Sequence, residues 1–168
     1  MKNILHRLDT IHDRLLATVT PLEVEIYQRR AAEDEWSVAE IVHHLCLVEE
    51  RVIKDLDRAL QQEPRQPALL RRLIPTSIVA SRVLRVKSPK AVVPTSPPEK
   101  EVAIDEYNNA RDRLKDLCAR SGEQRLRSTT FKHPFLGEIS GVATVSFVGY
   151  HEKRHYKQIC EVLRKLGR

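Results

Sequence analysis

The sequence is poor in glycine and in aromatic residues. Of its 168 residues, only 5 are glycine, and aromatic residues make up 5%. Because sheets joined by tight turns use more glycine, this composition favours helices over an all-β architecture. The length suits one hydrophobic core and is short for two. We therefore expect a single domain over residues 1–168.

Cysteine is also scarce. Cys46, Cys118 and Cys160 are odd in number, widely spaced and without a CxxC pair. This pattern argues against a disulfide scaffold and against a zinc ribbon, and it fits a reducing compartment. We therefore expect a cytoplasmic protein.

Long hydrophobic runs are missing. The longest stretch without Asp, Glu, Lys or Arg extends from Ile139 to His151, well short of the about 20 apolar residues that a membrane helix needs. Charges at Lys2 and Arg7 come too early for the apolar part of a signal peptide. We therefore expect no membrane span.

Acidic residues are absent between Pro64 and Pro98, a segment that holds seven basic residues and seven of the nine prolines. We treat residues 63–100 as a basic, proline-rich insert in an otherwise nearly neutral chain. It is either a solvated connection with one short helix within Thr76–Lys87 or a basic rim for an anionic ligand. It has no aromatic side chains for base stacking, so nucleic acid is not an expected partner.

Apolar residues recur at helical spacing in four segments. The expected helices cover Ile4–Glu25, Ser37–Gln61, Val102–Ser121 and Ser140–Leu166. Four amphipathic helices of this length predict an all-α four-helix bundle with no sheet. The short connection between the first two fits antiparallel neighbours, whereas the long insert can return the chain so that the second and third run parallel. The predicted order is up-down-down-up.

Three histidines fall on inward faces of two helices. At about 100° per residue, His44 lies at the edge of the apolar stripe of the second helix, whereas His43 points to solvent. His151 and His155 lie one turn apart on the inward face of the fourth helix. Imidazoles at this spacing can bind one ion, as in the HExxH helix of metalloproteases, or can be ordinary core residues.

Three segments resemble two motifs of the DinB-like superfamily. The segment Trp36–Leu45 resembles the start of that family's second helix, where a Trp-Ser pair precedes a ligand histidine. The segments His133–Gly137 and His151–Ile159 resemble its ending, "HP-x-x-G … H-x-x-x-H-x-x-Q-I". The resemblance covers both ends of the bundle, and no motif covers the insert.

This resemblance implies an up-down-down-up bundle that holds a divalent ion with His44, His151 and His155. Zinc or nickel fits imidazole ligands best, and iron or manganese is compatible with them. Characterised members include transferases of low-molecular-weight thiols. The resemblance therefore implies a metal-dependent thiol S-transferase, acting on a small-molecule thiol and an electrophilic substrate in detoxification or stress, in a chain that forms a homodimer.

Other functions stay open. The same ion could activate water, which would make the protein a metal-dependent hydrolase. Alternatively, a non-catalytic binding or stress-response module would recognise an anionic partner. Glu152 and Gln158 lie near the ligand face and are the candidate catalytic residues, although each is also compatible with a plain helix position. His133, which precedes Pro134, better fits a role in loop structure than a role as an extra ligand.

Overall fold

The computed structural model describes residues 1–65, 89–133 and 136–168. Four long helices form most of this part of the chain: α1 (Lys2–Val19), α3 (Val38–Leu60), α4 (Lys100–Arg127) and α5 (Gly141–Lys165). The shorter elements are α2 (Val24–Gln28), the 3₁₀ helix η3 (Lys90–Val92) and the strands β1 (Thr130–His133) and β2 (Gly137–Ser140).

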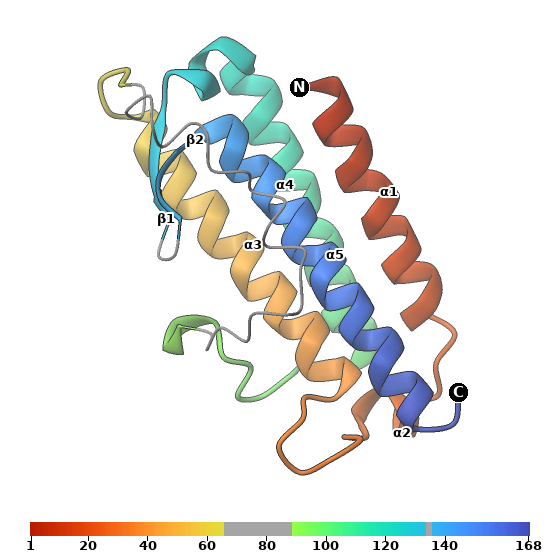
Figure 1. Cartoon of the computed structure of the whole chain (residues 1–168). Helices are drawn as coiled ribbons and strands as arrows, with labels where there is room; N and C mark the ends of the chain where they lie inside the picture. Colours follow the sequence, from red (N-terminus) through yellow and green to blue (C-terminus); the bar gives the residue numbers. More distant parts are fainter. Residues whose placement is uncertain (66–88, 134–135) are drawn as a thin grey trace.

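The four long helices form the predicted bundle. In Figure 1, α1 and α5 run down the view, whereas α3 and α4 run up it, which confirms the up-down-down-up order. α3 packs most extensively against α4, and α1 packs against α5. The insert connects the parallel pair α3 and α4, as their spacing in the sequence requires. Its expected helix within Thr76–Lys87 lies outside the described residues.

The first helix ends earlier than its apolar periodicity predicts. α1 stops at Val19, and a separate short helix, α2, follows from Val24. The cause is Pro21, which has no N–H to donate to the carbonyl of Ala17 and whose ring would clash with that carbonyl. The expectation of one continuous helix to Glu25 was therefore wrong.

The third helix is interrupted at Gly122, where we expected it to stop. Gly122 has φ 73° and ψ 156°, and α4 continues beyond this kink to Arg127. Glycine adopts this backbone conformation without the steric cost that a Cβ would bring. Gly122 therefore ends the first helical segment of α4, as predicted, and a short second segment follows the kink to Arg127.

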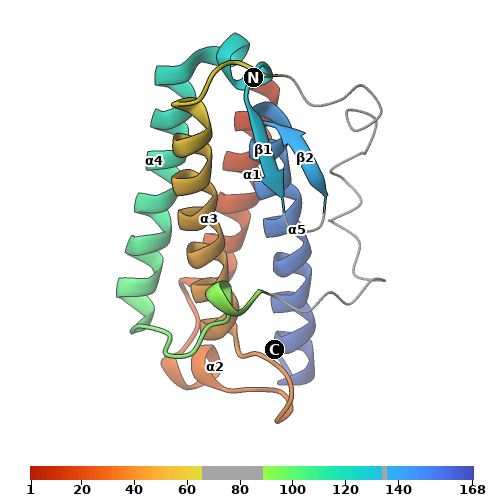
Figure 2. The same cartoon turned by 90° about the vertical axis from the view of Figure 1, so that its left-hand side faces the viewer.

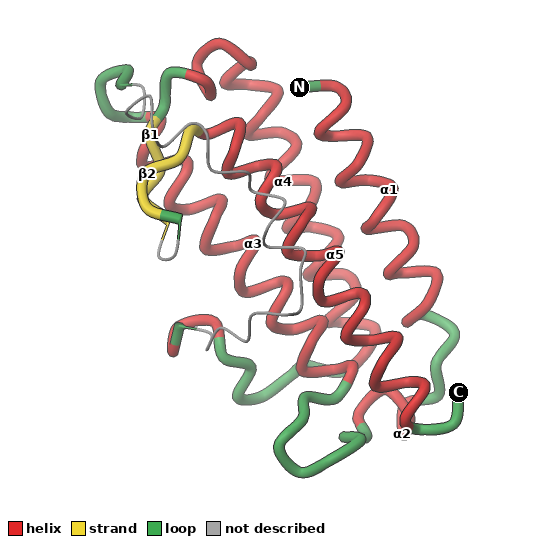
Figure 3. Tube along the Cα trace, viewed as in Figure 1, coloured by secondary structure: helices red, strands yellow, loops and turns green. Residues whose placement is uncertain are grey.

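The expectation of no sheet was wrong. β1 and β2 form a two-stranded antiparallel sheet in which Thr130 lies opposite Ser140 and His133 opposite Gly137. Figure 3 shows these short strands beside a molecule that is otherwise helical. Each strand has only four residues, too few for an alternating pattern to distinguish it from a loop.

Both helices that carry the candidate ligands begin at a serine cap. Oγ of Ser37 accepts from N–H of Glu40 at 3.2 Å, and the Glu40 carboxylate accepts from N–H of Ser37 at 2.8 Å. This is the predicted capping box, which satisfies two backbone donors at once. At α5, Oγ of Ser140 accepts from N–H of Ala143 at 3.2 Å. These caps define where each ligand-bearing helix begins.

The interior of the bundle consists of two apolar clusters. One includes Leu15, Ile41 and Ile159, and the other includes Leu8, Leu56 and Leu114. Each long helix also carries one buried polar side chain, at a sequence position between its residues of one cluster and its residues of the other. We call these four side chains the polar layer: His12, Glu49, Arg111 and Glu152.

None of the helices within the described ranges is both long enough and apolar enough to cross a membrane.

Two glycines of α5 provide a matched test of this packing. A Cβ on Gly141 would lie 2.8 Å from the backbone oxygen of Leu126, whereas a Cβ on Gly149 would lie 3.6 Å from the Leu8 side chain, an ordinary contact. We expect Gly141→Ala to lower the free energy of unfolding by about 1–3 kcal/mol through overpacking. Gly149→Ala should leave it unchanged or raise it by up to about 1 kcal/mol, because alanine favours helix. Urea denaturation of both variants measures this, and equal effects would contradict the packing at Gly141.

Candidate metal centre

Three imidazoles from two helices share one small volume. His44 comes from α3, and His151 and His155 come from α5. Their ring centroids lie 5.2 Å apart for His44 and His151, 4.7 Å for His44 and His155, and 4.5 Å for His151 and His155. Each offers a ligand nitrogen, and these nitrogens all lie within 4.8 Å of one another. His44 and His155 are buried, and His151 is half-buried.

This donor set fits a divalent ion. Imidazole nitrogens bind zinc at about 2.0–2.1 Å, so two ligands of a tetrahedral ion lie about 3.3 Å apart. The three nitrogens lie within 4.8 Å of one another, wider than that distance by at most about 1.5 Å. Within the described part of the chain, the cluster holds three histidines and no carboxylate. Such a set leaves at least one position of the ion open, which is typical of catalytic sites.

Hydrogen bonds orient two of the three imidazoles. Nδ1 of His44 donates to the carbonyl oxygen of Val92 in η3 at 2.7 Å, and Nδ1 of His155 donates to Oε1 of Gln158 at 2.9 Å. Because each Nδ1 carries the proton, the lone pair that can bind an ion lies on Nε2. Gln158, a candidate catalytic residue in the sequence, thus contacts His155 and fixes its tautomer.

The surroundings favour unprotonated imidazoles. Burial lowers the pKa of His44, although its bond to the Val92 carbonyl opposes this effect. Burial, with His155 and His44 nearby, lowers the pKa of His151 well below its ordinary value. Metal ligation requires neutral imidazole, so these groups are in the state that binds an ion at neutral pH.

Aromatic rings and two elements outside the bundle border the cluster. The ring centroid of Trp36 lies 4.9 Å from that of His44 and 6.4 Å from that of His155. The ring centroid of Phe147 lies 5.4 Å from that of His151. Figure 2 shows η3 and the β1–β2 sheet over the same face of the bundle, formed by α3 and α5.

His133 belongs to the hairpin. Its Nδ1 accepts from N–H of Leu136 at 3.1 Å, and its ring packs on Phe147 at 4.3 Å. Burial lowers the pKa of His133 to about 4, so it is neutral at physiological pH. These contacts agree with the expected role in loop structure.

A sequence profile of the DinB superfamily matches residues 7–159. The chain belongs to the DinB superfamily. This confirms the family that the motifs around His44 and His155 indicated.

Individual relatives match this DinB-superfamily protein over most of its length. The chain is 26% identical over 156 residues to an Oceanobacillus iheyensis protein named as a candidate metal-dependent hydrolase, covering 92% of this chain and 80% of the relative. It is 24% identical to the uncharacterised protein YuaE of Bacillus subtilis, covering 88% and 89%.

Two solved structures share the bundle. One is YfiT from Bacillus subtilis, described as a probable metal-dependent hydrolase with an unusual four-helix bundle topology. It has a TM-score of 0.68 and 16% identity, covering 99% of this chain and 87% of YfiT. The other is the four-helix bundle protein TT2238, with a TM-score of 0.65 and 21% identity, covering 95% and 98%. At these identities, the likeness establishes the fold.

Glu152 does not join the histidine cluster of this DinB-superfamily protein. Its Oε1 accepts from the Tyr107 hydroxyl at 2.6 Å and from Nδ1 of His12 at 3.1 Å, and its Oε2 accepts from Nη2 of Arg111 at 2.8 Å. Burial opposes ionisation, but the bond from His12 and the charge of Arg111 outweigh it and hold the pKa of Glu152 below its ordinary value. Both oxygens are engaged in the interior, so a proton-transfer role at the site is not supported.

His43, expected to point to solvent, is half-buried and lies outside the cluster.

The polar layer was missed in the sequence. Its signal is a charged residue at an inward position, such as Glu49 among Leu45, Val52 and Leu56 on α3. Burial raises the pKa of Glu49, although the Arg111 guanidinium beside it acts in the opposite direction. A single inward charged residue does not reveal which residue on another helix it pairs with, so the polar layer is recognised only when the packing of the helices is known.

Gln158 provides a test of how the ligands are oriented. Gln158→Leu removes the acceptor for Nδ1 of His155, so we expect affinity for zinc to fall about 10-fold or more. Gln158→Glu keeps an acceptor oxygen and should retain wild-type affinity. Competition with a chromophoric chelator measures both constants. Equal affinity of wild type and Gln158→Leu would contradict this orienting role.

Proposed function

We propose that this protein is a metal-dependent enzyme whose divalent ion is bound by Nε2 of His44, Nε2 of His155 and a ring nitrogen of His151. The observation that carries the proposal is the grouping of their ligand nitrogens within 4.8 Å. Membership of the DinB superfamily and the hydrolase names of a relative and of YfiT support it. Zinc and nickel are the ions that suit three imidazoles best.

Hydrolysis is the reaction that we favour. The three neutral imidazoles would hold a divalent ion without offsetting its charge, and such an ion would lower the pKa of a water at its open position to about 7. The chain's own residues prepare the site for this chemistry: the Val92 carbonyl and Gln158 fix the tautomers of His44 and His155. Trp36 and Phe147 provide apolar walls beside the ligands, which fits a substrate with an apolar group next to the bond that is cleaved.

Transfer of a low-molecular-weight thiol is the second candidate. The observation that favours it is the absence of a carboxylate in the cluster among the described residues, since three neutral donors leave the positive charge available to an anionic thiolate. The two buried cysteines do not replace that thiol: burial raises the pKa values of Cys46 and Cys118 to about 11. The homodimer expected from the family resemblance stays a prediction.

Elemental analysis of untagged protein purified without chelators tests the metal centre. We expect close to one divalent ion per chain, and His44→Ala, His151→Ala and His155→Ala should each weaken binding by more than about 100-fold because one of three ligands is lost. His43→Ala is the matched control, since it removes the neighbouring imidazole and should leave metal content unchanged. Metal content that is unaltered in His155→Ala would refute the assignment.

Two assays on the zinc-loaded protein separate the reactions. Hydrolysis predicts turnover of activated ester or amide substrates without added thiol, and its loss in His151→Ala. Thiol transfer predicts that consumption of a generic electrophile requires bacillithiol, mycothiol or glutathione and is lost in the same variant. A binding module instead predicts neither activity, together with association to anionic partners that weakens steeply with salt.

A further inference from the structure

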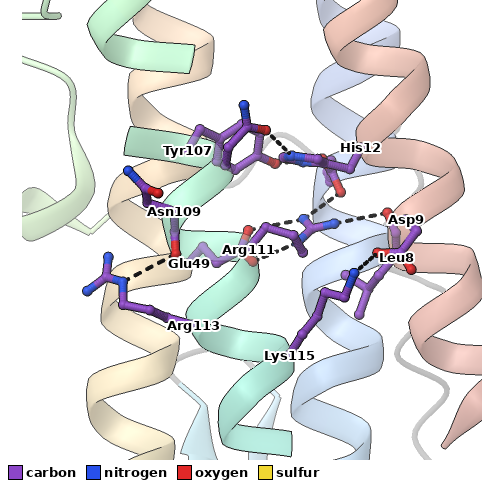
Figure 4. Close-up of polar contacts among 11 residues, drawn as sticks. Leu8, Asp9, His12, Glu49, Tyr107, Asn109, Arg111, Arg113 and Lys115 are labelled. Carbon is purple, nitrogen blue, oxygen red and sulfur yellow. Dashed lines mark hydrogen bonds and ion pairs between the residues drawn. The ribbon is translucent and has the colours of Figure 1, made fainter. Parts of the chain in front are cut away.

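One buried guanidinium contacts both helices that carry the candidate ligands. Nε of Arg111 in α4 donates to Oε1 of Glu49 in α3 at 2.7 Å, and its Nη2 donates to Oε2 of Glu49 at 3.1 Å. The same Nη2 donates to Oε2 of Glu152 in α5 at 2.8 Å. Nη1 donates to the carbonyl oxygen of Leu8 in α1 at 2.9 Å. Figure 4 shows Arg111 between Glu49 and the backbone of α1.

Each carboxylate lies close in sequence to a candidate ligand on the same helix. Glu49 follows His44 by five residues, and Glu152 directly follows His151 and precedes His155 by three. A helix is stiff over such short distances, so the position of the carboxylate determines the position of the imidazole. Because one residue corresponds to about 100° of rotation, any turn of α5 that moves His151 also pulls Glu152 from its partners.

The Glu152 side chain has little conformational freedom, because both of its carboxylate oxygens accept hydrogen bonds. Its Oε1 accepts from Tyr107 and from His12, while its Oε2 accepts from Arg111. These bonds fix the rotation of α5 about its own axis. The two bonds to Glu49 fix α3 relative to the same guanidinium.

We propose that Arg111 is a positioning residue for the metal centre: it holds α3 and α5 in the register in which His44 meets His151 and His155. This inference rests on the proposed function, since it requires that the three histidines bind an ion. Arg111 belongs to a helix that supplies no ligand, and it acts through Glu49 and Glu152.

Stability alone does not account for this arrangement. Replacing a buried ion pair by apolar side chains of similar volume is often neutral or stabilising, because desolvation of the charges offsets their attraction. Apolar packing, however, tolerates small slides and rotations between helices, whereas a forked guanidinium has fixed donor directions. A metal site needs its ligands within about 0.5 Å of the productive geometry, which directional bonds supply.

The test therefore removes the charges without leaving any of them unpaired. The triple variant Glu49→Leu, Arg111→Met and Glu152→Gln has no buried ions at these positions. The new amide oxygen at position 152 can still accept from Tyr107 and His12. Urea unfolding of the chelator-treated protein measures stability, zinc competition measures affinity, and the visible absorption of bound Co²⁺ reports the geometry of the ligands.

We expect the triple variant to unfold at a urea concentration similar to that of wild type, to bind zinc at least 10-fold more weakly and to show an altered Co²⁺ spectrum. Zinc affinity within twofold of wild type together with an identical spectrum would overturn the inference. Absence of zinc and Co²⁺ binding by the wild type would overturn the proposed function and, with it, this inference, so the two failures are distinguishable.

Two further variants make the test specific. Arg111→Lys keeps a buried positive charge opposite Glu49 and Glu152. Its ammonium group cannot reproduce the forked donor geometry of the guanidinium, so zinc affinity should again fall. Unchanged zinc affinity would contradict the proposal even if the triple variant fails to fold. Lys115→Met is the matched control. Lys115 lies one turn further along α4 and pairs at 3.0 Å with Asp9 of α1, a helix without ligands. Its loss should leave zinc affinity and the Co²⁺ spectrum unchanged.

Discussion

The contact of Arg111 with Glu49 and Glu152 is the interaction on which the relative placement of the helices depends. It lies between two apolar clusters whose dispersion contacts attract without specifying direction. The guanidinium reaches α1, α3 and α5 from α4, so all four helices meet at one side chain. The apolar clusters account for the association of the helices, and the polar layer restricts the rotation of each helix about its own axis.

The topology of the bundle and the metal centre are linked through the long connection. Because α3 and α4 run parallel, the chain must return along the bundle before α4 begins. That connection includes η3, whose Val92 carbonyl accepts from His44. The hairpin between α4 and α5 borders the cluster in turn, with His133 packed on Phe147. The helices thus provide the ligands, and the connections provide their surroundings.

Periodicity in the sequence predicted the helices and the convergence of His44 with His151 and His155, because both follow from about 100° of rotation per residue. It failed where a single residue overrides the pattern, as Pro21 does in α1. Periodicity also placed Glu152 at the candidate site, because it gives only the approximate direction of a side chain and does not identify its hydrogen-bond partners. The bond to the Val92 carbonyl could not be foreseen, because every residue has a backbone oxygen and only the fold selects one of them.

The central claim is that three imidazoles hold one ion. A crystal of the zinc-loaded protein, measured at the zinc absorption edge, tests it most directly. The account predicts one anomalous peak for each chain, bonded to Nε2 of His44, Nε2 of His155 and a ring nitrogen of His151 at about 2.0–2.1 Å. A peak bonded to other residues, or none between α3 and α5 despite full zinc loading, would contradict it.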